Sequence, residues 1–293
     1  MRDERDAKGE GQGGGSASEP GQREVAELNL PERETEDERL FQREEVEEAE
    51  FVHTDPWRVF RIMGEFVEGF DTLAGLGPAV SIFGSARVLP EDPWYQAAEE
   101  TARRFVEEGF AVITGGGPGI MEAANKGATL AGGQSVGCNI ELPFEQGMNP
   151  YVRTAINFRY FFVRKTMFVK YAAGFLIFPG GFGTLDELFE ALTLIQTHKV
   201  RNFPVVLVGR EYWGGMMSWI QEFLLAEGKI SSEDMDLLRL TDSPAEAVSH
   251  VVQAYVEQIR EARTRAHRRQ KRSAVGDPGR RGAGKQAIWP QDI

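Results

Sequence analysis

Short apolar runs alternate with amphipathic stretches along the middle of the chain. Apolar residues recur at helical spacing from Val59 to Phe70, which predicts a first helix there. Apolar runs of four to six residues, bounded by glycine or proline, predict strands at Ala79–Phe83, Phe110–Thr114, Ser135–Ile140, Phe175–Phe178 and Pro204–Val208. Amphipathic patterns predict helices at Pro93–Glu108, Ile120–Leu130, Phe158–Tyr171, Thr184–Gln196, Tyr212–Leu225 and Pro244–Ile259, with Glu141–Asn157 as a long polar connection.

Strands that alternate with helices indicate βαβ units and therefore a parallel sheet. Right-handed crossovers place helices on both faces of such a sheet. We predict an α/β fold in which residues 51–262 form a single doubly wound, Rossmann-like parallel sheet with a leading helix. Residues 1–50 are acidic and poor in apolar side chains, so we predict a disordered tail that is helical at most near Glu36–Glu50. Residues 263–293 are predicted to form a basic disordered tail.

The charge distribution argues against a primary nucleic-acid binder. The net charge of the 293 residues is −12, and residues 1–50 hold 17 acidic against 7 basic side chains. A single cysteine, Cys138, rules out an intramolecular disulfide framework, and four scattered histidines give no metal-binding pattern. The chain has no apolar run long enough to span a membrane and no signal-peptide pattern, so we expect a cytoplasmic protein.

Three predicted strands end in turns of small residues. These turns are Gly84-Ser85, Gly115–Gly119 and Gly180–Gly183, and a helix follows each of them. Glycines at a helix N-terminus allow backbone N–H groups to approach a phosphate closely. The turns contain neither GxxxxGK[ST] nor GxGxxG, which disfavours a P-loop NTPase and a standard dinucleotide site. Two polyglycine turns in one sheet favour phosphate binding over the alternative, in which they only make tight turns.

Two further features allow two interpretations each. Thr184 and Glu187 have the spacing of a capping box, in which Glu187 bonds back to the helix start. Glu187 is placed equally well to face a sugar at the mouth of a site. Arg164 and Lys165 lie among aromatic residues in a predicted helix, as a solvated basic edge or as an anion clamp. The residues alone slightly favour the solvated edge.

Taken together, these motifs resemble the Lonely Guy (LOG) family of nucleotide 5′-monophosphate phosphoribohydrolases. Residues 179–187, PGGFGTLDE, are similar to its PGGxGTxxE motif, and Arg164-Lys165 resembles its second signature. The resemblance covers residues 79–255, and the stretch Asn139–Gln146 is similar to a bacterial long-form subgroup. Members are often labelled lysine decarboxylases, but no lysine here has a recognisable pyridoxal phosphate context.

The resemblance implies hydrolysis of a nucleoside 5′-monophosphate, such as AMP or a cytokinin riboside 5′-monophosphate, to a free base and ribose 5-phosphate. It implies Glu187 and Arg164 as catalytic residues, no cofactor or metal, and a homodimer. Arginine is a poor proton donor because of its high pKa, so Arg164 would orient Glu187 or the leaving base. The implied substrate- and phosphate-binding residues are Gly84, Ser85, Gly116, Gly117, Gly119, Lys165, Gly180, Gly181, Gly183 and Thr184.

Two rival hypotheses remain at this stage. One is a nucleotide-binding or carrier protein of the same Rossmann-like superfamily that performs no turnover and needs no carboxylate beside the sugar. The weaker one is an RNA-associated protein that acts through its basic C-terminal residues, whose binding would be strongly salt-dependent.

Overall fold

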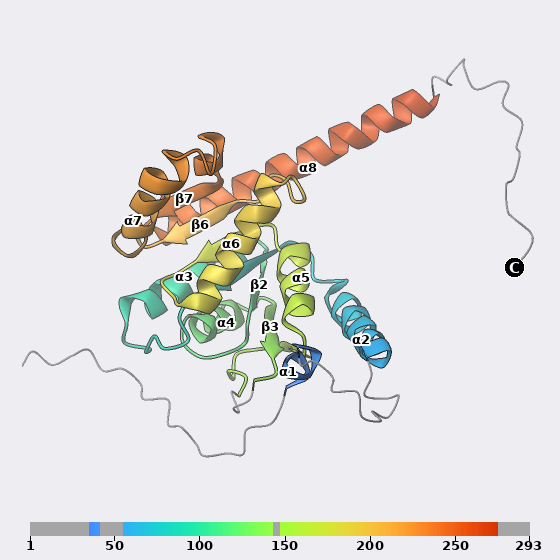
Figure 1. Ribbon diagram of the computed structural model, residues 1–293, viewed down its shortest axis with the longest axis vertical. Coiled ribbons are helices and arrows are strands. Elements are labelled where there is room, and N and C mark those ends of the chain that lie inside the picture. The colour runs from blue at the N-terminus through green and yellow to red at the C-terminus, as the bar shows by residue number, and fades with distance from the viewer. Residues whose placement is uncertain (1–34, 42–54, 143–146, 275–293) are drawn as a thin grey trace, which may run out of the picture. The chain divides into compact units, whose positions relative to one another are not determined.

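The computed structural model describes residues 35–41, 55–142 and 147–274, with the backbone alone for residues 55 and 265–274. Their centre is a seven-stranded sheet in the order β4-β3-β2-β1-β5-β6-β7, and every strand pairs in parallel (Figure 1). The strands are β1 Ala79–Phe83, β2 Ala111–Thr114, β3 Ser135–Ile140, β4 Thr154–Phe158, β5 Phe175–Ile177, β6 Val205–Val208 and β7 Leu238–Thr241.

Helices cover both faces of this sheet. One face carries α2 Asp55–Leu73, α5 Phe161–Tyr171, α6 Phe182–Gln196 and α7 Arg210–Trp219. The other carries α3 Pro93–Glu107, α4 Ile120–Leu130 and α8 Pro244–Ala274. A π-helical turn, η2 Ile220–Leu225, continues α7, and a 3₁₀ turn, η3 Glu233–Leu237, precedes β7. The predicted doubly wound α/β fold is confirmed.

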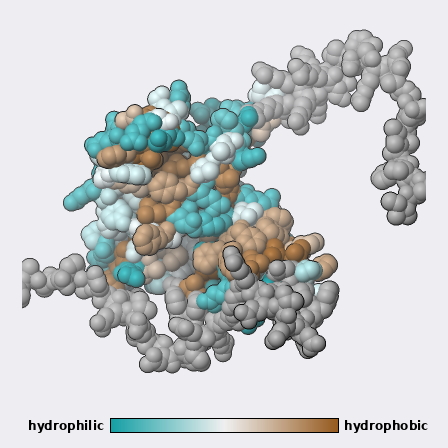
Figure 2. Space-filling model, in the orientation of Figure 1, coloured by the Kyte–Doolittle hydropathy of each residue, from teal (hydrophilic) through white to brown (hydrophobic). Residues whose placement is uncertain are grey.

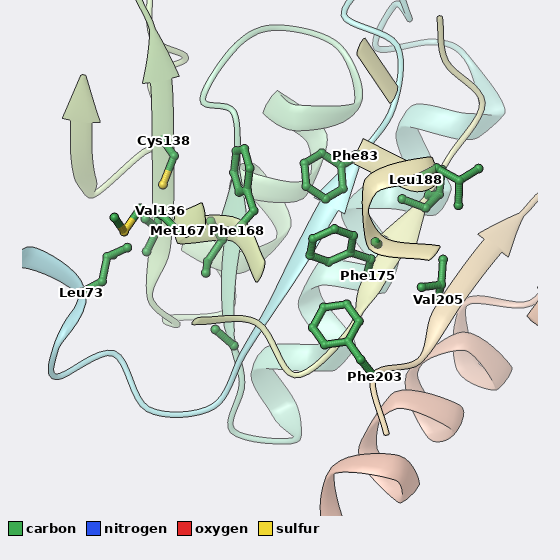
Figure 3. Close-up of a cluster of buried hydrophobic side chains, with 14 of the residues drawn as sticks. Leu73, Phe83, Val136, Cys138, Met167, Phe168, Phe175, Leu188, Phe203 and Val205 are labelled. Atoms are coloured by element: carbon green, nitrogen blue, oxygen red, sulfur yellow. The ribbon is translucent and has the colours of Figure 1, made fainter. Parts of the chain in front are cut away.

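Buried side chains alternate between two cores along the central strands. In β1, Ala79 and Phe83 face the α2–α5–α6 side, whereas Val80 and Ile82 face the α3–α4–α8 side. Phe83 packs edge to face against Phe168 and Phe175, with ring centroids 5.0 and 4.9 Å apart (Figure 3). This packing fixes α5 on the sheet close to the carboxyl ends of β1 and β5, where ligands bind in open parallel sheets.

The two strands at the edges of the sheet, β4 and β7, were not predicted from the sequence. The first four residues of β4 lie inside the predicted polar connection, and only Ile156 and Phe158 of its five residues are buried. β7 likewise has only Thr241 fully buried. Edge strands of this kind lack the continuous apolar run that marked the central strands. Because Phe158 belongs to β4, α5 begins at Phe161 rather than at Phe158.

The prediction of a disordered basic tail from residue 263 is wrong for its first part. α8 continues from Pro244 to Ala274, fifteen residues past its predicted end at Ile259. Its added residues are mostly arginine, alanine, glutamine and lysine, which have high helix propensity. Residues 275–293 lie outside the described part of the chain.

The prediction for residues 1–50 also needs a correction. Helix α1 spans Glu36–Phe41, within the stretch where the prediction allowed a helix, but it contacts the folded body, so this stretch is not a solvated tail. Residues 1–34 and 42–50 lie outside the described residues. Across the described ranges, none of the helices combines the length and the hydropathy that crossing a lipid bilayer requires.

Candidate active site

A cavity of about 850 Å³ opens at the carboxyl ends of β1, β2, β3 and β5. Four segments supply most of its wall: the turn after β1, the start of α5, the turn after β5 and the first turns of α6. Of the residues predicted for the site, it brings together Gly84, Ser85, Arg164, Gly180, Gly181, Gly183, Thr184 and Glu187. Gly116, Gly117, Gly119 and Lys165 do not line it.

The turn after β5 leads directly into the first turn of α6. Gly181 is the N-cap of α6 and provides no side chain for capping, so no side chain caps the first N–H groups of this helix, whose first turn lines the cavity. A Cβ atom at Gly180 would lie 2.1 Å from Thr184 Oγ1 and 3.0 Å from Ser85 N, so only glycine fits there. The Tyr212 hydroxyl donates to Gly180 O at 2.7 Å and fixes this turn from α7.

The other polyglycine turn, Gly115–Gly119, mainly contacts neighbouring segments and contributes little to the cavity wall. Gly119 has φ +68°, and a Cβ atom there would lie 2.3 Å from Ser85 O, so it allows the two turns to touch. The Asn149 side chain donates to the carbonyl oxygens of Gly116 and Gly117 at 3.0 and 2.9 Å. Only Gly115 of this turn reaches the cavity wall, so the α6 turn is the better placed of the two for an anion.

Glu187 does not form the capping box that its spacing allows. The helix begins at Phe182, two residues before Thr184, so Thr184 is not its N-cap. Both carboxylate oxygens of Glu187 are buried and have no hydrogen-bond partner among the described residues, although the side chain lines the cavity. Loss of solvation raises the pKa of Glu187 to about 7, against the opposing effect of Lys165 and Arg164.

Arg164 reaches the cavity from α5. Its guanidinium carbon lies 4.8 Å from the Phe161 ring centroid and 5.6 Å from that of Phe168. The residue is partly exposed as a whole, but its Nε is buried and lacks a hydrogen-bond partner within the described chain. Burial lowers the pKa of Arg164, and Glu187 is the largest of the negative charges that oppose this shift. The cavity therefore contains a carboxylate and a guanidinium that both have buried atoms without hydrogen-bond partners among the described residues.

Lys165 has a different position from that predicted. Its Nζ lies 2.6 Å from Glu190 and 2.8 Å from Asp186, on the α6 surface beside the cavity. Its distance to Glu187 Oε1 is 3.9 Å. Lys165 thus neutralises Asp186 and Glu190 on α6. Its positive charge also lowers the pKa of Glu187, although Lys165 does not line the cavity.

Comparison with known proteins shows which proteins the chain is similar to. A family model described as "Possible lysine decarboxylase" matches residues 121–251. The cytokinin riboside 5′-monophosphate phosphoribohydrolase of Mycobacterium tuberculosis is 29% identical over 160 residues, which are 52% of this chain and 82% of that protein. These matches support the resemblance of the chain to the Lonely Guy (LOG) family.

Two further matches are more limited in extent or in similarity. The pyrimidine/purine nucleotide 5′-monophosphate nucleosidase of Escherichia coli K12 is 31% identical over 124 residues, or 39% of this chain and 27% of that relative. A Moco carrier protein from Chlamydomonas reinhardtii superposes with a TM-score of 0.46 at 23% identity, covering 61% of this chain and 98% of that structure.

Several residues that line this cavity were not identified from the sequence. Two large aromatic side chains, Trp94 and Tyr212, come from the first turns of α3 and α7, and Phe161 comes from the first turn of α5. The remaining missed residues are Phe83, Ala86, Arg87, Val88, Met121, Ile140, Leu142 and Phe168, whereas Gly115, Pro179 and Phe182 belong to turns and motifs that the sequence had indicated. The available signal was position, because helices that follow parallel strands start at the edge where ligands bind.

The raised pKa of Glu187 predicts a pH-dependent stability. The folded protein holds the proton up to about pH 7, whereas the unfolded chain releases it near the ordinary value of 4.5. Stability contributed by this group is therefore present below pH 4.5 and is lost as the pH rises toward 7. Wild type should lose on the order of 3 kcal/mol relative to Glu187→Gln between these limits. Urea unfolding of both proteins at pH 5, 6, 7 and 8 measures this difference, and parallel curves would contradict the burial of an unpaired carboxylate.

Proposed function

We propose that this protein hydrolyses the N-glycosidic bond of nucleoside 5′-monophosphates, such as AMP or a cytokinin riboside 5′-monophosphate, to a free base and ribose 5-phosphate. One observation carries the proposal: the Glu187 carboxylate lines the cavity, buried and without hydrogen-bond partners among the described residues. Burial of a carboxylate without hydrogen-bond partners lowers the stability of the folded protein, so the presence of Glu187 here indicates a role other than stabilisation. The names of the relatives described above support the same reaction.

The chemistry needs a carboxylate near the anomeric carbon. When the C1′–N bond breaks, positive charge develops on the ribose ring, as it does in glycoside hydrolysis. The Glu187 carboxylate stabilises that charge and accepts a proton from the attacking water, whose oxygen bonds to C1′. The base leaves with the bonding electron pair and takes up a proton from solvent, and Glu187 then releases its own proton to solvent, so the net reaction consumes one water molecule. A pKa of about 7 suits this role because the group is largely ionised just above neutral pH and is still basic enough to accept a proton.

The start of α6 is the proposed anchor for the 5′-phosphate. Its free N–H groups and the positive end of the helix dipole favour an anion, and Gly180, Gly181 and Gly183 leave the backbone accessible. Thr184 adds a hydroxyl at the same end. Glu187 lies one turn further along the helix, at a spacing that suits the distance between a 5′-phosphate and C1′.

Arg164 is proposed to act as a fixed cation opposite Glu187. It opposes full protonation of the carboxylate and can donate hydrogen bonds to the leaving base or to Glu187. The aromatic residues Phe161, Phe168 and Trp94 in the cavity wall offer apolar surfaces for a planar base.

The proposed enzyme is a homodimer. Six apolar side chains of α2 are between 37% and 66% exposed, and Figure 2 shows hydrophobic surface over this part of the molecule. They are Trp57, Val59, Phe60, Met63, Val67 and Phe70. Exposed apolar patches of this kind mark interfaces. Light scattering should give twice the chain mass of 32.7 kDa, and a monomer would contradict the dimer.

A substrate panel tests the proposed function. Purified wild type is incubated with AMP, GMP, CMP, UMP and a cytokinin riboside 5′-monophosphate, and released base is measured by chromatography. We expect base and ribose 5-phosphate from at least one monophosphate. Adenosine should react at least about 100-fold more slowly than AMP, because the phosphate contacts supply binding energy for the reaction. Glu187→Gln is the control for contaminating activity. Binding of monophosphates without any base release would leave the non-catalytic carrier hypothesis.

A further inference from the structure

Helix α1 has a well-defined start within the described residues. Thr35 and Glu38 form a reciprocal capping box: Thr35 N donates to Glu38 Oε2 at 2.7 Å, and Glu38 N donates to Thr35 Oγ1 at 3.2 Å. Leu40 packs against the core on the side of α2 and α5. The segment is therefore a folded part of the body.

Two elements hold α1 in place through Glu36. Its Oε2 lies 3.2 Å from Arg61 of α2 and accepts a hydrogen bond from the Tyr160 hydroxyl, also at 3.2 Å. Tyr160 is buried and directly precedes α5. In Figure 1, α1, drawn in blue, lies close to the lower end of α5.

Asp37 provides the cap that α5 otherwise lacks. The N-cap residue of α5, Tyr160, makes no side-chain capping bond. Instead, Phe161 N donates to Asp37 Oδ2 at 3.1 Å, although the two residues are 124 positions apart. A carboxylate at a helix N-terminus is favourable because it accepts an otherwise unpaired N–H and meets the positive end of the dipole.

The same cap lies beside the candidate catalytic arginine. Arg164 follows Phe161 by one turn, and its guanidinium stacks over the Phe161 ring at 4.8 Å. The second oxygen of Asp37 is buried without a hydrogen-bond partner among the described residues, and so is Nε of Arg164. A desolvated guanidinium requires negative charge nearby, and the carboxylates that stabilise its charged form are Glu187 first, then Asp186 and Asp37.

We propose that Asp37 is a positioning residue of the active site: it caps α5 and, together with Glu187, supplies the negative charge that holds the Arg164 guanidinium at the cavity wall. The assignment rests on the proposed function for its effect on turnover. It also ties a segment before the α/β domain to the reaction, since residues 35–41 contribute a side chain that acts on the site.

The Asp37→Asn variant separates charge from capping. Asparagine still offers an oxygen to Phe161 N but removes the negative charge. We expect kcat to fall roughly 10- to 100-fold, as for other groups that orient a functional side chain. KM for the monophosphate should change less than about threefold, because the phosphate anchor lies on α6. Asp37→Glu, which keeps the charge, should recover part of kcat.

The matched control is Glu38→Gln in the full-length protein. It removes one negative charge from the same helix, and glutamine preserves the capping box. This variant should keep kcat within about twofold of wild type. Asp37→Ser, which also provides an oxygen acceptor, is a second neutral variant in case Asp37→Asn folds poorly.

A readout independent of turnover is the ¹⁵N resonance of the Arg164 Nε–H group, assigned by its loss in Arg164→Lys. We expect Asp37→Asn to shift this resonance and Glu38→Gln to leave it in place. A wild-type kcat and an unmoved resonance in Asp37→Asn would overturn the proposal. Equal losses of kcat in both variants would also overturn it, because docking of α1 alone would then explain the effect. If wild type releases no base from any monophosphate, the proposed function fails, and the resonance shift still decides whether Asp37 holds Arg164.

Discussion

Glu187→Gln should lose nearly all turnover while remaining at least as stable as wild type. Glutamine cannot accept the proton of the attacking water and cannot balance the positive charge on the ribose ring. We expect kcat to fall about 10³-fold or more. Because the carboxylate is buried without hydrogen-bond partners among the described residues, its neutral replacement removes a desolvation cost at neutral pH. Base release and urea unfolding at pH 7.5 measure both effects on the same samples.

The matched control for this prediction is Glu190→Gln, one turn further along α6. Glu190 pairs with Lys165 and does not line the cavity, so its replacement should change kcat only a few-fold. A capping role for Glu187 makes the opposite prediction: stability lower by about 1 kcal/mol and activity retained. That pair of results would refute the assignment of Glu187 as the reacting carboxylate.

Replacement of Arg164 should produce the second large effect. Arg164→Lys keeps a positive charge but loses the planar guanidinium, and we expect kcat to fall about 100-fold. Arg164→Met removes the charge as well. Because Arg164 lowers the pKa of Glu187, its loss should raise that pKa above about 7 and move the acid limb of the activity profile to higher pH.

Profiles of kcat against pH for wild type, Arg164→Lys and Arg164→Met provide the measurement. Lys170→Met serves as the control, since Lys170 is an exposed cation near the other end of α5, over the Phe70 and Tyr171 rings. Its profile should match that of wild type. An acid limb that stays in place in Arg164→Met would show that the guanidinium does not act on Glu187.

The central part of the fold was predictable because its strands are buried on both faces. The apolar runs Ala79–Phe83 and Ser135–Ile140 coincide with β1 and β3 at both ends. The edge strands β4 and β7 were not predictable in the same way, since half-exposed strands alternate polar and apolar residues over only four or five positions. The position of α1 on the body depends on contacts with Arg61, Tyr160 and Phe161, which no local pattern reveals.

The site was only partly predictable for a related reason. The spacing of Thr184 and Glu187 satisfies a capping box and an active-site carboxylate equally well, and a difference of two residues in the start of α6 separates the two. The turn Gly115–Gly119 has the composition of a phosphate loop, but its glycines are needed for contact with the Ser85 turn and with Asn149. Asp37 could not be found from sequence, because its target is 124 residues away.

A crystal structure of the Glu187→Gln variant with AMP tests the account most directly, because the substrate should remain intact. We predict the 5′-phosphate on the first N–H groups of α6, with C1′ in contact with the residue 187 side chain and with the base beside Arg164. A nucleotide bound in the cavity with C1′ directed away from both side chains would contradict the account.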